Sequence, residues 1–310
     1  MHLAVIGVGR VGRMTLLALA HEFWIKKLTL ADVVPRLAEA VAEEIRHTIA
    51  STRVPMKVFA SDRDEAVEGA DMVLVTAGFP RTPEMKDRTQ LTAVNARMIK
   101  KIAEAIGPRN PEAKFIIVTN PVDAMGTLFK KISGADWVIS TGTNLESQRF
   151  RSELSKQLNV PITAVTGFVG GEHGANAVLL WSTVRIEGKP LEDYLNHTQK
   201  TLNKERVKES VKEISRMIIQ VSGGTRQGPA VSFRDILRSI ALNDNKILSV
   251  AAPYKTPQIP ESVMVSIPCM VGKSIGPTLE PFLIEKERGK LQKAANKIYG
   301  TYQEALTSLV

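Results

Sequence analysis

Residues 3–12 read LAVIGVGRVG, and this stretch decides the fold. The apolar run LAVI predicts a buried β-strand. It leads directly into Gly7, Gly9 and Gly12, which have the spacing GxGxxG. In a strand–loop–helix unit, these glycines allow a tight turn, a close approach of the backbone to a pyrophosphate, and close packing of helix on strand, in that order. The stretch therefore predicts the first βα unit of a dinucleotide-binding sheet, with the phosphates at the helix N-terminus.

An acidic residue follows the next predicted strand, at a distance from the glycines that is typical of a dinucleotide-binding fold. KLTLA (27–31) predicts this second strand, and Asp32, which ends it, lies 20 residues after Gly12. A carboxylate at this place can bond the ribose 2′-hydroxyl, and it repels the 2′-phosphate of NADP, so NAD is the expected cofactor. Arg36 lies nearby in sequence and could ease some use of NADP. The alternative is that Asp32 only begins a turn.

The first half of the chain alternates short apolar runs with helical patterns. Further strands are predicted at 56–59, 72–76, 115–119 and 137–140, and helices at 35–50, opened by Pro35, and at 90–106. This alternation is typical of an α/β fold with right-handed crossovers. We therefore predict a Rossmann-type, doubly wound parallel sheet.

The second half changes character. Strands are predicted near 165–169, 178–186, 247–251 and 263–271, and helices near 203–221, 229–242 and 286–309. The apolar stripe of the 203–221 helix indicates either core or a subunit contact. We expect a dinucleotide-binding domain over 1–141, and a mixed α+β catalytic domain that binds substrate over 142–310.

Composition excludes several classes of protein. The chain has 310 residues, 44% hydrophobic and 24% charged, which is ordinary for a globular protein. No apolar run is long enough to span a membrane, and the N-terminus does not resemble a signal peptide. The one cysteine, Cys269, excludes an intramolecular disulfide and fits a reducing compartment such as the cytoplasm. The net charge of +9 comes from 41 basic and 32 acidic residues that are interleaved, which favours a solvated mixed surface over a nucleic-acid surface.

Four further segments point to one family. They are VTAGFPR (75–81), VTNPVD (118–123), GTNLESQRFR (142–151) and GGEHG (170–174). With the glycine loop, and in this order over essentially the whole chain, they resemble the malate and lactate dehydrogenases, and specifically the malate members. The resemblance implies an NAD-dependent oxidoreductase that interconverts malate and oxaloacetate in the tricarboxylic acid cycle. Lactate dehydrogenase, or another 2-hydroxy-acid dehydrogenase on this scaffold, is the alternative, and a non-catalytic basic dinucleotide-binding protein or sensor subunit is more remote.

The resemblance makes His173 the group that takes and returns the substrate proton. An imidazole suits this work because its ordinary pKa of about 6.5 lies near working pH. Glu146 stands where the family carries an Asp that orients this histidine, so the pair has one extra methylene. By the same resemblance, Arg149 binds the substrate carboxylate next to the reacting carbon. Positions 146 and 149 share a helix face, so both side chains can reach one cleft.

Two loop arginines complete the expected site. By resemblance, Arg81 pairs with the second carboxylate of oxaloacetate, where lactate dehydrogenases carry Gln. Arg88 resembles the arginine that polarises the substrate carbonyl and stabilises the developing oxyanion. The two are seven residues apart, one more than is usual in the family, so the loop 79–91 that would close over the substrate carries an extra residue.

The remaining expectations concern ligands and partners. Asn120 is expected to contact both substrate and cofactor, and Thr225 to line the substrate pocket. No cluster has metal-ligand spacing, so no metal is assigned. The family forms homodimers and homotetramers, and the 35–50 helix, which carries His47, packs at a subunit interface in it. The full set expected to contact the cofactor is Gly7, Gly9, Arg10, Val11, Gly12, Asp32, Thr76, Ala77, Gly78, Asn95, Val118 and Asn120.

Overall fold

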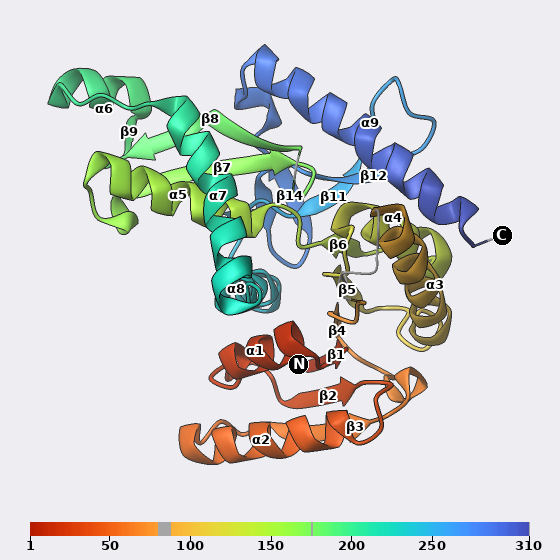
Figure 1. The fold of residues 1–310 in the computed structure, drawn as a ribbon. Coiled ribbons are helices and arrows are strands. Elements are labelled where there is room, and N and C mark those ends of the chain that lie inside the picture. Colours follow the sequence, from red (N-terminus) through yellow and green to blue (C-terminus); the bar gives the residue numbers. More distant parts are fainter. Residues whose placement is uncertain (80–87, 175, 310) are drawn as a thin grey trace.

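The computed structural model describes residues 1–79, 88–174 and 176–309, and for Arg88 the backbone alone. The first half builds a parallel sheet with helices on both faces (Figure 1). Its strands are β1 (His2–Ile6), β2 (Lys27–Ala31), β3 (Lys57–Ser61), β4 (Met72–Val75), β5 (Lys114–Ile117) and β6 (Val138–Ser140). Its helices are α1 (Arg10–Leu19), α2 (Leu37–Thr52), α3 (Arg88–Ile106) and α4 (Val122–Ser133). The strand order β3-β2-β1-β4-β5-β6 is that of a doubly wound dinucleotide-binding fold, as the sequence predicted.

Strand side chains alternate between two cores, one on each face of the sheet. Leu3 and Val5 of β1 pack with α1, α2 and α8 (Gln227–Leu242), whereas Ala4 and Ile6 pack with α3, α4 and α9 (Glu285–Thr307). Because successive side chains of a strand point to opposite faces, a strand covered on both sides must be apolar throughout. This requirement explains the continuous apolar runs of the first half.

The same sheet continues into the second half of the chain. Ser140 of β6 pairs antiparallel with Ala251 of β11, and the strand order runs on as β11-β12-β7-β8-β9. A small second sheet has the order β10-β13-β14. The strands of this half are β7 (Val165–Gly171), β8 (Ala177–Ile186), β9 (Lys189–Pro190), β10 (Lys246–Leu248), β11 (Ala251–Tyr254), β12 (Val263–Ser266), β13 (Cys269–Val271) and β14 (Ile275–Thr278). Its remaining helices are α5 (Asn144–Leu158), α6 (Leu191–Thr198) and α7 (Lys204–Ser222).

In two places the sequence predicted one strand where the structure has two, so these predictions were wrong. The run 247–251 is divided between β10 and β11, and the run 263–271 between β12 and β13. In each case one part joins the large sheet and the other joins the small sheet. Apolar periodicity cannot show this division, because it is decided by pairing partners that are distant in sequence.

Two helix details also differ from the prediction. Pro35 lies in a turn, and α2 begins only at Leu37, after Arg36 with a left-handed φ of 63°. The stripe on α7 is core only in its first part: Val207 and Val211 are buried, but Val221 is 83% exposed. Among the described residues, the C-terminal part of α7 therefore joins no buried core, although Ile214 and Ile218 are half-buried. The helix ends at Ser222, and Gly223 follows it as the C-cap residue with φ +72°.

A buried acid links the two halves of the molecule. Glu22, in the connection between α1 and β2, is 1% exposed and pairs with Arg234 at 2.5 Å and Arg238 at 2.8 Å, both on α8. The indole N–H of Trp24 donates to the same carboxylate. Removing one partner of such a buried ion pair leaves an uncompensated charge. Glu22 thus fixes α8, which belongs to the second half, against α1, which follows the glycine loop.

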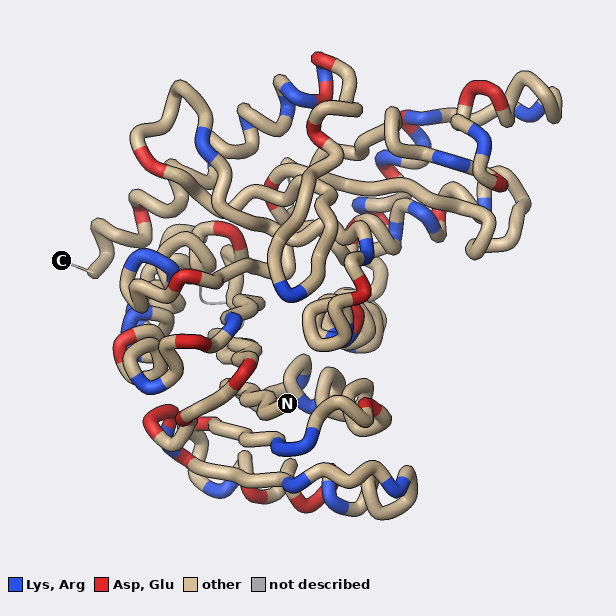
Figure 2. The backbone as a smooth tube through the Cα atoms, turned by 180° about the vertical axis from the view of Figure 1, so that it is seen from behind, with Lys and Arg blue, Asp and Glu red and all other residues tan. Residues whose placement is uncertain are grey.

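Charge is distributed over the molecule. Figure 2 shows Lys and Arg alternating with Asp and Glu along many elements. Exposed i,i+3 ion pairs such as Arg36–Glu39 and Lys208–Glu205 are examples of this interleaving. Among the helices in the described part of the chain, none combines the length and apolar character that crossing a bilayer requires.

Candidate active site

A cavity of about 520 Å³ lies where the two halves of the chain meet. It is lined by seven of the residues that the sequence singled out, which come from both halves: Val11, Val118, Asn120, Glu146, Arg149, His173 and Thr225. The carboxyl ends of parallel strands provide such a crevice in α/β sheets, and the loops after β1 and β5 reach it here. The structure therefore brings His173, Glu146 and Arg149 together with part of the predicted cofactor site around one space.

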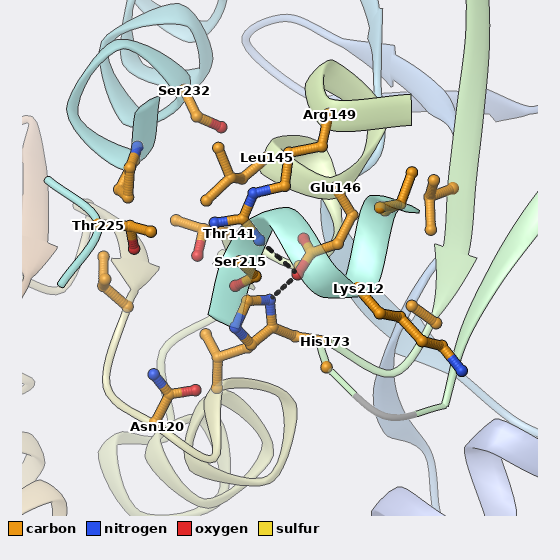
Figure 3. Close-up of a pocket in the computed structure, with 18 of the residues that line it drawn as sticks. Asn120, Thr141, Leu145, Glu146, Arg149, His173, Lys212, Ser215, Thr225 and Ser232 are labelled. Carbon is orange, nitrogen blue, oxygen red and sulfur yellow. Dashed lines mark ion pairs between the residues drawn. The ribbon is translucent and has the colours of Figure 1, made fainter. Parts of the chain in front are cut away.

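His173, Glu146 and Arg149 form a compact charged group in this cavity (Figure 3). Nδ1 of His173 lies 2.9 Å from Oε1 of Glu146. The guanidinium of Arg149 approaches the same oxygen at 4.0 Å. Glu146 and Arg149 project from one face of α5, and His173 follows β7. The extra methylene of Glu146, relative to the family's Asp, thus does not prevent contact with the imidazole.

The three groups alter one another's proton affinity. Burial works to lower the pKa of His173, but the carboxylate of Glu146 2.9 Å from Nδ1, helped by that of Asp123, outweighs it and raises this pKa to about 9. Burial works to raise the pKa of Glu146, but His173 and Arg149 outweigh it and leave this pKa lowered. The protein therefore holds Glu146 ionised and favours a protonated imidazole.

The glycine loop fits the pyrophosphate of a dinucleotide. A Cβ added to Gly7, which has φ +86°, would lie 2.3 Å from the backbone nitrogen of Ala77, and a Cβ on Gly12 would lie 2.3 Å from the carbonyl oxygen of Gly7. A Cβ on Gly9, in contrast, would meet no atom within 4 Å. The N-cap residue of α1, which begins at Arg10, is Gly9, which has no side chain to cap the helix. Free backbone N–H groups beside an open position are what an anionic group at a helix N-terminus needs.

Asp32 lies at the end of β2 and contacts this loop directly. One carboxylate oxygen accepts a hydrogen bond from the backbone N–H of Val8 at 2.8 Å, and the other accepts from Val34 at 3.0 Å. Asp64, which sequence analysis missed, lies close enough for its pKa to be raised to about 6 by burial and by the charges of Glu65 and Asp32. The end of β2 is therefore acidic. Arg36 is 86% exposed and pairs with Glu39.

The loops after β4 and β5 are joined to each other. Asn95 is 1% exposed, accepts from the backbone N–H of Phe79 at 2.9 Å and donates to the carbonyl of Asn120 at 2.7 Å. The hydroxyl of Thr119 donates to the carbonyl of Ala77 at 2.5 Å. Thr76 and Ala77 donate from their backbone nitrogens to Ile6, and Gly78 follows them. Asn95 thus uses its amide to brace the loop that carries Asn120.

Two predicted residues cannot be placed in the cavity. Arg81 lies outside the described residues, and Arg88 is described only as the first residue of α3. Within the described ranges, no group of His, Cys, Asp or Glu has the arrangement of a metal site.

Sequence analysis missed several residues of the cavity wall. Leu145, Ser215 of α7, and Ser232 and Phe233 of α8 line it, together with Lys208 and Lys212 at its α7 side. Asp123, next to the cavity, accepts a hydrogen bond from the backbone N–H of His173. An apolar stripe with charged flanks identifies α7 as a helix, but it does not show which flank faces a ligand.

Comparison with known proteins identifies one family for the whole chain. Two family models match the chain: lactate/malate dehydrogenase, NAD binding domain, over residues 1–138, and lactate/malate dehydrogenase, alpha/beta C-terminal domain, over residues 143–307. A malate dehydrogenase of Sulfolobus acidocaldarius is 40% identical over 99% of this chain and 97% of its own length.

More distant relatives include both activities. An L-lactate dehydrogenase of a Thermoanaerobacter species is 32% identical over 97% of this chain and 98% of its own. The crystal structure of malate dehydrogenase from Plasmodium falciparum in complex with NADH has the same fold, with a TM-score of 0.90, 21% identity and full coverage of both chains. The chain therefore belongs to the lactate/malate dehydrogenase family of NAD-dependent oxidoreductases.

Proposed function

We propose that the protein is an NAD-dependent malate dehydrogenase that interconverts malate and oxaloacetate. The observation that supports this most is the group formed by His173, Glu146 and Arg149 in one cavity beside the glycine loop. Binding of a dinucleotide alone needs none of the three. The 40% identity to a protein named malate dehydrogenase favours the dicarboxylate over other 2-hydroxy acids.

Each residue has a distinct task in this proposal. Bound NAD supplies or accepts the hydride. His173 takes the hydroxyl proton of malate, or gives it back to the carbonyl oxygen of oxaloacetate. Glu146 holds the ring through Nδ1, which leaves Nε2 for the substrate. Arg149 offers a planar fork that matches the carboxylate next to the reacting carbon.

The loop arginines take the remaining roles by resemblance. Arg88 polarises the substrate carbonyl, and Arg81 pairs with the second carboxylate. Arg81→Gln should therefore lower kcat/KM for oxaloacetate relative to that for pyruvate by roughly 10²-fold or more, because the pairing of a desolvated charge is lost. Steady-state kinetics with both keto acids measures this ratio. A ratio that stays at the wild-type value would remove Arg81 from substrate selection.

The deciding experiment is oxidation of NADH with oxaloacetate and with pyruvate, repeated with NADPH. Malate dehydrogenase activity predicts a large preference for oxaloacetate and for NADH. A preference for pyruvate would identify the alternative, a lactate dehydrogenase, to which relatives at 32% identity give some weight. Binding of NADH without turnover of either acid would indicate the non-catalytic alternative.

Cofactor choice should depend on Asp32. Asp32→Ser removes the charge next to the site of a 2′-phosphate but keeps an oxygen that can accept from Val8. The ratio of the dissociation constants for NADPH and NADH should fall at least about tenfold, since a like charge a few ångströms away costs on the order of several kcal/mol at intermediate dielectric. Titration with both cofactors measures the ratio. An unchanged ratio would show that Asp32 does not select NAD.

The kcat/KM for oxaloacetate reduction and that for malate oxidation should depend on pH with opposite signs. Oxaloacetate reduction needs protonated His173, so its kcat/KM should be level at neutral pH and fall above the pKa of about 9. Malate oxidation needs the neutral ring, so its kcat/KM should rise with pH and level off near the same value. Both profiles can be recorded with one enzyme preparation. If kcat/KM in both profiles changed near pH 6.5 instead, Glu146 would not raise the pKa of His173.

The assembly and location are also proposals. Met217, Ile219 and Val221 near the end of α7 are each more than half exposed, and α2 presents His47 to solvent, which supports a homodimer or homotetramer. Light scattering of the purified protein would test this. A single buried cysteine and a dicarboxylate substrate support a cytoplasmic enzyme of the tricarboxylic acid cycle.

A further inference from the structure

Asp123 is a buried acid next to His173. The roles described above do not include Asp123. It lies in the first turn of α4 and is 2% exposed. Its Oδ2 accepts a hydrogen bond of 2.7 Å from the backbone N–H of His173, a residue 50 positions further along the chain. The bond therefore joins the first turn of α4 to the segment that follows β7.

The backbone on both sides of His173 needs such a bond. Gly171 has φ +85° and Gly174 has φ +106°, so the histidine sits between two residues of wide conformational freedom. Glu146 holds only the ring, through Nδ1 at 2.9 Å. A ring can be placed reproducibly only if the main chain that carries it is also fixed, and Asp123 contacts that main chain.

The second oxygen of Asp123 is unusual. Oδ1 is buried and has no hydrogen-bond partner among the described residues. An ionised carboxylate with one bare, buried oxygen is costly. Burial, together with the nearby charges of Glu172 and Glu146, raises the pKa of Asp123 to about 7, although the hydrogen bond and charge of His173 oppose this. Asp123 can therefore be neutral or charged near physiological pH.

The charges around the imidazole show why this matters. Asp123, Glu146 and Glu172 are all buried, and among the described residues Arg149 is a cation whose charge opposes theirs at the ring; Lys208, Lys212 and Arg216 also line the cavity. When Asp123 ionises, it adds negative charge beside His173 and favours the imidazolium. When it is protonated, it keeps its hydrogen bond to the backbone but no longer stabilises the imidazolium.

We propose that Asp123 is a positioning residue for His173, which anchors the histidine's main chain through Oδ2 and adjusts the imidazole's proton affinity through its own charge. The proposal rests on the proposed function only in taking His173 as the proton carrier. Anchor and charge are separate effects, so they can be separated by substitution.

The test compares Asp123→Asn with Asp123→Ala. The amide oxygen of Asn can still accept from His173, but the charge is gone, so kcat at the pH optimum should stay within about tenfold of wild type. The imidazole should then titrate at lower pH, by on the order of one unit. Ala also loses the acceptor, so kcat should fall by a further factor of about ten or more while NADH affinity is retained.

Two readouts are needed. The first is the pH profile of kcat/KM, and the second is NMR titration of His173 in protein labelled with ¹⁵N-histidine. Asp136→Asn, an exposed acid just beyond the other end of α4, is the matched control and should shift neither readout. A purely structural Asp123 would change the melting temperature without moving the titration.

The outcomes are distinguishable. An unchanged His173 titration in Asp123→Asn would overturn the charge effect, and full kcat in Asp123→Ala would overturn the anchor. If Asp123→Ala does not fold, Asp123→Asn decides alone, and an unshifted titration then overturns the proposal. Because NMR needs no turnover, an inactive wild type with a shifted titration would refute the proposed function and leave this inference standing.

Discussion

His173→Ala should lower kcat for oxaloacetate reduction and for malate oxidation by roughly 10²- to 10⁴-fold, the usual contribution of a placed general acid or base. The imidazole is 30% exposed and opens into the cavity, so its loss removes the proton carrier without opening a large void in the core. NADH affinity should stay near the wild-type value, because the glycine loop is not altered.

Steady-state kinetics and a fluorescence titration of NADH measure the two quantities. His197→Ala, on the exposed side of α6, is the matched control and should retain full activity. If His173→Ala turned over within a few-fold of wild type, the proton would have to be carried by another group, and the assignment of the whole site would fail.

Arg149→Leu is expected to have the second large effect. It should lower kcat/KM by roughly 10²- to 10³-fold, because the substrate carboxylate would enter a site with no partner, at a cost of a few kcal/mol. The change should also raise the pKa of Glu146, since the charge of Arg149 helps to lower it. The imidazole would then have a less reliably ionised partner.

Arg149→Lys is the informative companion. It keeps the charge, but it cannot donate two parallel N–H groups to a carboxylate. Its kcat/KM should therefore lie between those of the wild type and Arg149→Leu. If the Lys and Leu variants were equally impaired, only the geometry of the guanidinium would matter. If the Lys variant were as active as wild type, the guanidinium fork would have no role at this position.

The first half of the fold was accessible from sequence because its signals are local. The strand predicted at 27–31 coincides with β2. An apolar run that is bounded by a lysine and an acid leaves few other choices for where the strand begins and ends. The glycine spacing predicted a turn, and Gly7 and Gly12 are indeed pressed against backbone atoms. What failed was the division of 263–271 into β12 and β13, because two different sheets draw on one apolar run.

The site shows the same limit. Glu146 and Arg149 share a helix face, and a glycine-flanked histidine stands out, so these residues could be chosen from sequence and family resemblance. The link from Asp123 to His173 could not be predicted from sequence. A carboxylate that accepts from a backbone N–H can pair with almost any residue type, so the sequence holds no sign of its partner. The cavity-facing side of α7 was missed because its lysines look like any solvated helix flank.

The pairing of Ser140 with Ala251 and the ion pairs of Glu22 bear on how the cleft can move. A single residue pair of β6 and β11 lies where the two halves meet, and the buried carboxylate of Glu22 pairs with two arginines of α8. Hinge bending of whole halves would have to disturb both contacts, so we expect the walls of the cleft to keep one arrangement during turnover.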